Sequence, residues 1–190
     1  MTKLSAAFAL AGVLMAAAGV RANSCDNSSL AGDYALTATG EVLGVLDASG
    51  TLHPFTAPQP LNAVGQITFD RNGGLTRIDF PINNGTPGIT PGTPLTESGF
   101  RTGQTGTYSL SDDCTGMMVV NFPGGVVIDF AIAVQGHGQV VNAVVAHEHV
   151  PALPPAVVPS GATCDASSSG CDVGGNVLSV MTSNTPRRSR

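Results

Sequence analysis

The sequence has few of the residues on which several common functions depend. Tryptophan is absent, tyrosine occurs twice, and charged residues make up only 11% of the 190 residues. A glycosidase needs two acids that face each other across a sugar, and sugar grooves are usually lined with aromatic rings, so this composition disfavours carbohydrate chemistry. The chain has eight basic and 13 acidic residues. It therefore offers no basic patch for phosphates, which disfavours nucleic-acid binding.

Common catalytic and cofactor motifs are missing as well. There is no G-x-S-x-G elbow for a nucleophilic serine, and no glycine-rich loop opens a helix to hold a phosphate. After residue 22, apolar residues do not recur with the period of an α-helix. The sequence therefore predicts no catalytic residue and no cofactor.

The first 22 residues have the pattern of a cleaved secretory signal. Lys3 is followed by an apolar run over residues 6–20, and small residues precede a cleavage point after Ala22. The run is shorter than the roughly 20 residues of a membrane-spanning helix, so we expect no stable membrane insertion. We expect export to the periplasm or the exterior, a single domain over residues 23–185, and a flexible basic tail over residues 186–190.

Four cysteines remain after the predicted cleavage, at positions 25, 114, 164 and 171. An even number of cysteines in an oxidising compartment favours disulfides, and four cysteines allow three pairings. Cys164 and Cys171 lie in one loop, so we expect them to pair, which leaves Cys25 for Cys114. Metal binding by these cysteines is disfavoured because none of them has C-x-x-C spacing.

Short β-branched runs separated by Gly, Asp, Asn and Pro predict an all-β domain. Both faces of residues 126–146 are largely apolar, whereas a sheet with one solvated side alternates more cleanly. Eight or nine antiparallel strands joined by short turns predict a single up-and-down barrel, with a sandwich as the alternative. The predicted strands are 33–46, 51–56, 61–69, 75–81, 98–110, 115–122, 126–135, 139–149 and 175–183.

Two long connections, at residues 82–97 and 150–174, are rich in Pro, Gly, Ser and Thr. Loops of this length in a small domain are usually functional or disordered. In an up-and-down order they fall at the same end of the barrel, which is then the expected opening of a pocket. The opposite end would carry the tight turns at 47–50, 70–73, 111–114 and 136–138.

Three segments carry a family resemblance. The segments GDYAL at residues 32–36, AVGQITFD and GGL within 63–75, and TGTYSL and DCTG within 105–116 resemble bacterial exported proteins of unknown function with a calycin-like or allene-oxide-cyclase-like small β-barrel. The resemblance covers about residues 25–135. It implies a barrel and, by analogy, a cavity for a small apolar molecule. Because such barrels include cyclising enzymes, it also implies an alternative, a cofactor-free cyclase or isomerase.

Polar residues inside such a cavity would hold a ligand. Asp129 lies mid-strand among apolar residues, and burial would raise the pKa of its carboxyl group. The alternative for Asp129 is an ion pair with Arg77 or Arg101, or an outward position. Arg77 and Asp79 share one face of their strand, and we expect them to flank each other in solvent. The candidate ligand-binding residues are Tyr34, Tyr108 and Asp129.

The segment His147-Glu148-His149 suggests a third function, metal binding. Alternate residues of a strand point to one face, so both imidazoles could bind one transition-metal ion such as zinc. A third ligand would be needed, and the candidates are His53, His137 and Asp129. The alternative is a polar strand end that meets solvent.

Overall fold

The computed structural model describes residues 24–90, 92–155, 157–165, 167 and 169–185. The predicted signal peptide at residues 1–22 and the predicted tail at residues 186–190 lie outside this part of the chain. None of the helices in the described part is long and apolar enough to cross a membrane. The elements are η1 (Asn27–Leu30), β1 (Gly32–Leu46), β2 (Leu52–Phe69), β3 (Gly74–Asn83), β4 (Thr86–Pro87), β5 (Arg101–Leu110), β6 (Thr115–Asn121), β7 (Val127–Gln135), β8 (Val140–Val150) and β9 (Cys171–Ser183).

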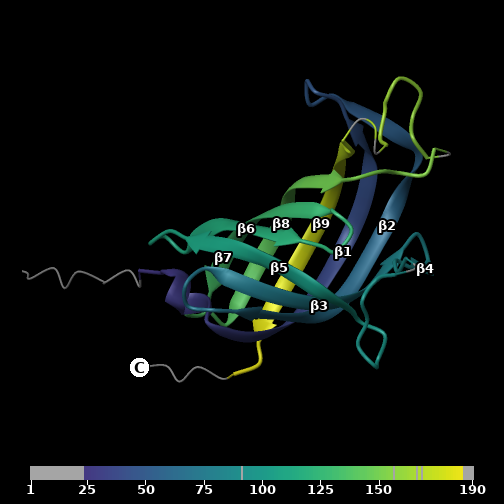
Figure 1. Ribbon diagram of the computed structural model, residues 1–190. Coiled ribbons are helices and arrows are strands. Elements are labelled where there is room, and N and C mark those ends of the chain that lie inside the picture. Colours follow the sequence, from purple (N-terminus) through teal and green to yellow (C-terminus); the bar gives the residue numbers. More distant parts are fainter. Residues whose placement is uncertain (1–23, 91, 156, 166, 168, 186–190) are drawn as a thin grey trace, which may run out of the picture.

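The strands form one antiparallel sheet that closes on itself (Figure 1). Strand β1 pairs with both β2 and β9, and β2 also pairs with β3, so no edge is left between the first and last strands. Strand β4 has two residues and pairs only with the end of β3, outside the ring. Eight strands in sequence order therefore make a closed up-and-down barrel with one short outer strand, which confirms the all-β barrel prediction and rules out the sandwich.

Several glycines allow the strands to bend into this ring. A Cβ atom on Gly40 would lie 2.0 Å from the carbonyl oxygen of Asn176, and one on Gly106 would lie 1.9 Å from that of Val119. These distances are far inside van der Waals contact, and the obstacle is backbone of the neighbouring strand. Glycine at sharp bends of a strand is a device by which barrels achieve their curvature.

The long strand β2 changes one sequence-based prediction. The predicted strands 51–56 and 61–69 are a single strand in which residues 55–58 bulge, because Val42 pairs with Gln59 and Gly44 with Pro54. Pro58 and Pro60 fall at and beside this bulge, where few ladder hydrogen bonds are required. The turn at 47–50 was therefore placed at the wrong end of the barrel.

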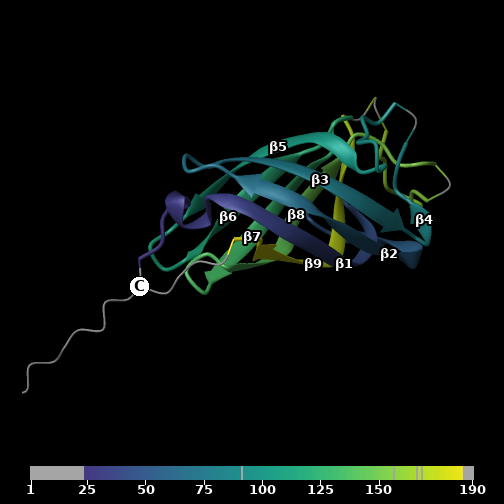
Figure 2. The ribbon, with the colours of Figure 1, turned by 90° about the horizontal axis from the view of Figure 1, so that it is seen from below.

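The two ends of the barrel carry different connections (Figure 2). One end, which we call the turn end, carries η1 and the connections 70–73, 111–114 and 136–139. The other, which we call the loop end, carries the long connections 84–100 and 151–170 together with 47–51 and 122–126. The prediction that both long loops share one end is confirmed.

Each end is fastened by a disulfide. Cys25–Cys114 joins the segment before η1 to the β5–β6 turn, and Cys164–Cys171 closes the 151–170 loop onto the start of β9. This is the pairing that the sequence favoured. The first disulfide spans 89 positions of the chain and the second spans seven, so in the chain-entropy account the first constrains the unfolded chain more strongly.

Candidate functional site

A charged cluster lies inside the barrel, on the wall formed by β3 and β5. Arg77, Asp79 and Gln104 are only 7%, 0% and 1% exposed. Arg77 and Asp79 alternate along β3 with Ile78 and Phe80, which are more exposed. The prediction that Arg77 and Asp79 lie in solvent is therefore wrong. The two-residue period of a strand places Arg77 and Asp79 correctly on one face. The apolar residues Ile78 and Phe80 make the other face look like the interior one, but the structure shows the reverse.

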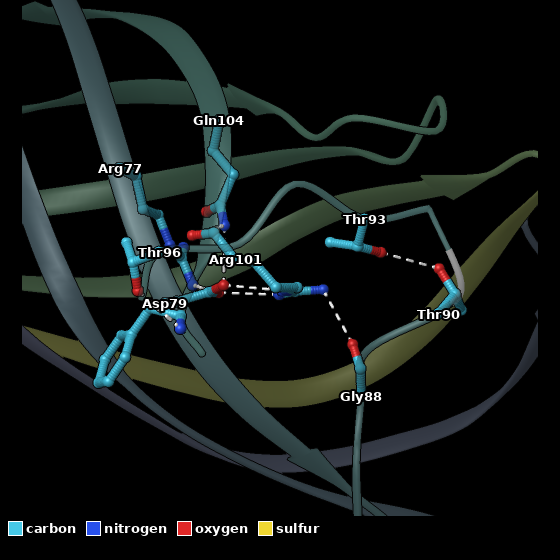
Figure 3. Close-up of polar contacts among 9 residues, drawn as sticks. Arg77, Asp79, Gly88, Thr90, Thr93, Thr96, Arg101 and Gln104 are labelled. Atoms are coloured by element: carbon cyan, nitrogen blue, oxygen red, sulfur yellow. Dashed lines mark hydrogen bonds and ion pairs between the residues drawn. The ribbon is translucent and has the colours of Figure 1, made fainter. Parts of the chain in front are cut away.

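Asp79 is the centre of this cluster (Figure 3). Arg101 donates to both of its carboxylate oxygens, from Nε and from Nη2, each at 2.8 Å. Arg77 Nη2 donates to Oδ2 at 2.7 Å, and Gln104 Nε2 donates to Oδ1 at 2.8 Å. A buried carboxylate with four donors is fully satisfied.

Electrostatics hold the cluster in its charged form. Burial alone would raise the pKa of Asp79, but hydrogen bonds and charge attraction from Arg101 and Arg77 outweigh it and hold that pKa below its usual value. Burial lowers the pKa of Arg77, although Asp79 opposes the effect. The ring of Phe122 covers both guanidinium groups, with its centroid 5.4 Å from Arg77 Cζ and 5.2 Å from Arg101 Cζ. Two guanidinium groups share one carboxylate, so the cluster carries an excess positive charge.

Two buried polar atoms of the cluster have no hydrogen-bond partner within the described residues. They are Arg77 Nε, a donor, and Gln104 Oε1, an acceptor. Their roles are unambiguous, because a flipped Gln104 amide would aim its oxygen at the Asp79 carboxylate. Arg77 and Gln104 are directly paired across β3 and β5. A buried unsatisfied atom costs about 1–3 kcal/mol, so a bound molecule that satisfies both atoms would be favoured.

Glu148 faces the interior from the opposite wall. His147 and His149 both contact Asp172 on the outside of the barrel, so the intervening side chain points inward. Strand β8 is four strands away from β3 in the ring of eight, in either direction. Glu148 is partly buried, and its side chain makes no hydrogen bond or ion pair with any described residue. Burial raises the pKa of its carboxyl group, and the charge of His147 opposes this only in part.

Small residues occupy inward positions between these two walls. Along β1, Ala38 and Gly40 continue the inward series that begins with Tyr34 and Leu36, and both are partly exposed although they face the interior. On β2 the inward series includes Ala63 and Gly65. An eight-stranded barrel is just wide enough to be filled by side chains or to hold one small ligand. Small side chains in this half favour the second arrangement.

The candidate ligand residues Tyr34 and Tyr108 lie elsewhere. Both are buried in the packed core of the turn end, where each ring meets Phe69 edge to face. The Tyr34 hydroxyl donates to the carbonyl of Gly138, and the Tyr108 hydroxyl lies against the carbonyls of Asn27 and Asp70. Burial, with the charge of Asp70, raises the pKa of Tyr108 to about 12. These contacts make both tyrosines part of the core and not of the cluster.

Asp129 and the two histidines form a surface group on the outside of the barrel. His147 lies 3.5 Å from Asp129 Oδ2 and 3.2 Å from Asp172 Oδ1, and His149 Nδ1 lies 2.8 Å from the same Asp172 atom. The hydrogen bond from His149, assisted by His147, lowers the pKa of Asp172 despite partial burial. Asp129 thus faces outward, which is one of the alternatives that the sequence left open, and its partner is His147 and neither Arg77 nor Arg101.

In the structure, the residues of this surface group contact one another as ion pairs. His53 pairs instead with Asp47, and His137 lies in the β7–β8 turn at the other end. Among the residues with described positions, no group of three or more His, Cys, Asp or Glu side chains is arranged to hold a metal ion. His149 Nε2 also lies 3.0 Å from the carbonyl oxygen of Ser169. The contacts therefore tie the end of the 151–170 loop to β8 and β9.

A cavity of about 380 Å³ opens beside this group, at the rim of the loop end. One side is formed by the end of β1 and the start of the β1–β2 turn, at residues 45–48. The other side is formed by residues 161–163 and 169–172, which belong to the long loop and the start of β9. Its walls include His149 and Asp172, but none of the residues of the Asp79 cluster. The rim cavity and the interior cluster are therefore separate features.

Sequence reasoning missed the members of the interior site. The sequence predicts Arg77 and Asp79 to lie in solvent, and it suggests Arg101 only as an ion-pair partner of Asp129. It assigns no role to Gln104 or to Glu148. The available signal was alternation: if the two histidines share an outward face, the residue between them must point inward.

The chain was compared with protein families, curated proteins and solved structures. No protein-family model matches the chain, and no curated protein matches it. Among solved structures, the structure of EF1p2_mFAP2b bound to DFHBI is similar, with a TM-score of 0.45 and 10% sequence identity over 86% of this chain and 98% of that chain. A likeness this distant carries no functional argument, so function has to be argued from this chain's own residues.

Proposed function

We propose that the protein binds a small, largely apolar molecule in the loop-end half of the barrel interior. The observation that carries this proposal is the buried cluster around Asp79, in which Arg77 Nε and Gln104 Oε1 have no hydrogen-bond partner among the residues that the structure describes. Natural interiors rarely leave such atoms unpaired, and each exception calls for a bound molecule or a role.

The surroundings of the cluster support a ligand. Ala38 faces the interior with a small side chain and is partly exposed there, and Phe122 contributes apolar surface next to the guanidinium groups. A pocket that is mostly apolar with a few convergent polar groups is the usual form of a small-molecule site. The ligand would lie between the β3–β5 wall and the β8 wall.

The experiment is a titration with the neutral fluorescent probe N-phenyl-1-naphthylamine. Ala38→Phe would fill the interior and should weaken probe binding by at least about tenfold, because a side chain would occupy the ligand's volume. Ala35→Phe is the matched control, since Ala35 lies on the same strand but is exposed on the outside. Equal binding by the two variants, or no binding by the parent protein, would contradict the proposal.

A second candidate function, a cofactor-free isomerase or cyclase, is favoured by Glu148. An inward carboxyl group without a partner could take a proton from a carbon next to a carbonyl and return it to another carbon, while Arg77 Nε stabilises the oxyanion. Glu148→Gln separates the two functions. A binding protein keeps its affinity and has no turnover to lose, whereas an isomerase keeps its affinity and loses turnover.

We also propose that the mature protein is an exported domain of residues 23–185, of the kind found in the exported barrels that the sequence resembles. The two disulfides support an oxidising compartment. Amino-terminal sequencing of the protein recovered from the periplasm or medium should begin at Asn23. Recovery of the intact chain from the cytoplasm would contradict export.

A further inference from the structure

We infer that the ligand carries a carboxylate with a neighbouring hydroxyl group, and that Arg77 and Gln104 recognise these two groups together. This inference rests on the proposed ligand-binding function and names the polar part of the molecule. In this arrangement the carboxylate accepts from Arg77 Nε, and the hydroxyl donates to Gln104 Oε1. The apolar remainder would extend along the small inward residues of β1 and β2.

The charge of the cluster favours an anion. Two guanidinium groups face a single carboxylate, and Asp79 already accepts hydrogen bonds at both oxygens. Arg101 has a further donor, Nη1, only 3.4 Å from the carbonyl of Gly88, which adds no charge. An anion placed against Arg77 would neutralise the excess positive charge in a buried, weakly screened position, where such pairing is strong.

The opposite wall does not supply this negative charge. Glu148 is the inward acid on β8, and burial raises the pKa of its carboxyl group, which favours the uncharged form. Because β8 and β3 are diametrically placed in the ring, the cluster and Glu148 do not pair. The excess positive charge of the cluster is therefore available to a ligand.

The second unpaired atom narrows the class of anion. Gln104 Oε1 can only accept, so a plain carboxylate would leave it unpaired and would place two acceptors side by side. A hydroxyl next to the carboxylate supplies the missing donor. Arg77 and Gln104 are direct cross-strand neighbours, and side chains at such positions lie about 5 Å apart at Cβ, which suits two adjacent groups of one molecule.

The test compares three ligands that share a ten-carbon chain: 2-hydroxydecanoate, decanoate and decanol. Each displaces the neutral probe from the full mature chain at pH 7. We expect the hydroxy acid to bind more tightly than the acid, and the acid more tightly than the alcohol. Each step should be about tenfold, as expected for one charge-assisted or buried hydrogen bond.

Two variants assign the two steps to residues. Arg77→Met should remove the preference for acid over alcohol, and Asp79 keeps both hydrogen bonds from Arg101 in this variant. Gln104→Met should remove only the preference for the hydroxy acid over the acid. Arg71→Met, in the exposed β2–β3 turn, is the control and should change neither preference. Thermal unfolding of each variant checks that the fold is intact.

The outcomes separate this inference from the proposed function. If the parent protein binds all three ligands equally, a buried water serves the unpaired atoms and the inference fails, while the binding function stands. The same conclusion follows if Arg77→Met or Gln104→Met leaves the preferences unchanged. If neither the probe nor any of the three ligands binds, the proposed function itself fails.

Discussion

The two halves of the barrel are filled in different ways. At the turn end, Tyr34, Phe69 and Tyr108 stack edge to face, Leu30 of η1 plugs the opening, and both tyrosine hydroxyls reach backbone carbonyls. At the loop end, the inward positions of β1 and β2 include Ala and Gly, and the polar cluster leaves two atoms unpaired. One half is a complete core, and the other has unmet hydrogen-bonding capacity.

This difference indicates a division of labour within one barrel. Buried aromatic rings with satisfied hydroxyl groups stabilise a fold. Unpaired buried polar atoms reduce stability, and proteins retain such costs mainly at functional sites. We therefore expect the turn end to provide most of the free energy of folding and the loop end to provide the binding site.

The two disulfides provide the largest contrast. Replacing Cys25 and Cys114 by alanine should lower the free energy of unfolding by about 4–5 kcal/mol, because this bond closes a loop of about 90 residues in the unfolded chain. Replacing Cys164 and Cys171 should cost about 2–3 kcal/mol, since that loop is short. Denaturant unfolding of both variants measures the difference. Equal losses would contradict the chain-entropy account, in which the disulfide that closes the longer loop contributes more to stability.

Asp79→Asn tests the charged cluster. The change leaves two buried guanidinium groups without their carboxylate, and breaking a buried pair in this way costs about 3–5 kcal/mol. Asp129→Asn is the control, because Asp129 is partly exposed and its ion pair with His147 is worth at most about 1 kcal/mol. If Asp79→Asn unfolds as easily as Asp129→Asn, then the cluster is not held by its charges.

Gly106→Ala tests whether the barrel requires glycine where a strand lies very close to the backbone of its neighbour. The new Cβ would overlap the carbonyl oxygen of Val119, so the strand must shift, and we expect a loss of about 2 kcal/mol or more. Gly174→Ala is the control, because its nearest obstacle is the end of the Leu52 side chain, which can rotate. Thermal unfolding of the two variants should differ clearly, and equal midpoints would argue against backbone overlap as the cause.

The smallest effect concerns the pH dependence of the two inward acids. The pKa of Asp79 is lowered in the folded protein, so its stabilisation is present above the unfolded pKa and is lost as the pH falls through the folded value. The pKa of Glu148 is raised, so the folded state binds the extra proton and stability falls as the pH rises above about 4.5, the unfolded value. Glu148→Gln should therefore gain stability relative to the parent between pH 4 and pH 7. A loss over that range would show that Glu148 is paired in the folded protein.

Much of the architecture could be predicted because it depends on local chemistry. Turns that open with Asp and contain Gly, such as residues 47–50 and 70–73, mark hairpins by themselves, so most strand limits were close to those observed. The pairing of Cys164 with Cys171 followed from the short loop between them. The exception was β2, which the sequence predicts as two strands, 51–56 and 61–69, because a bulge that tolerates proline leaves no signature of its own in the sequence.

The location of the site depended on orientation, which the sequence does not contain. The period of two assigns Arg77 and Asp79 to one face, and His147 and His149 to one face, but it does not say which face is inside. The usual evidence for the buried face is an alternation of apolar and polar residues. Several strands are apolar on both faces and therefore lack it. For this reason the sequence predicts Arg77 and Asp79 on the outer face of the barrel, where the structure has them on the inner face. It also gives no indication that Glu148 points inward.

Turn chemistry and chain distance were thus enough to predict most of the strands and both disulfides, whereas strand number left a sandwich as the alternative to a barrel. Only the tertiary structure decided which side of each strand became the interior. The direction in which the sheet curves makes that choice for all strands at once. It placed Arg77, Asp79, Arg101 and Gln104 in the interior, where Asp79 accepts hydrogen bonds from the other three side chains.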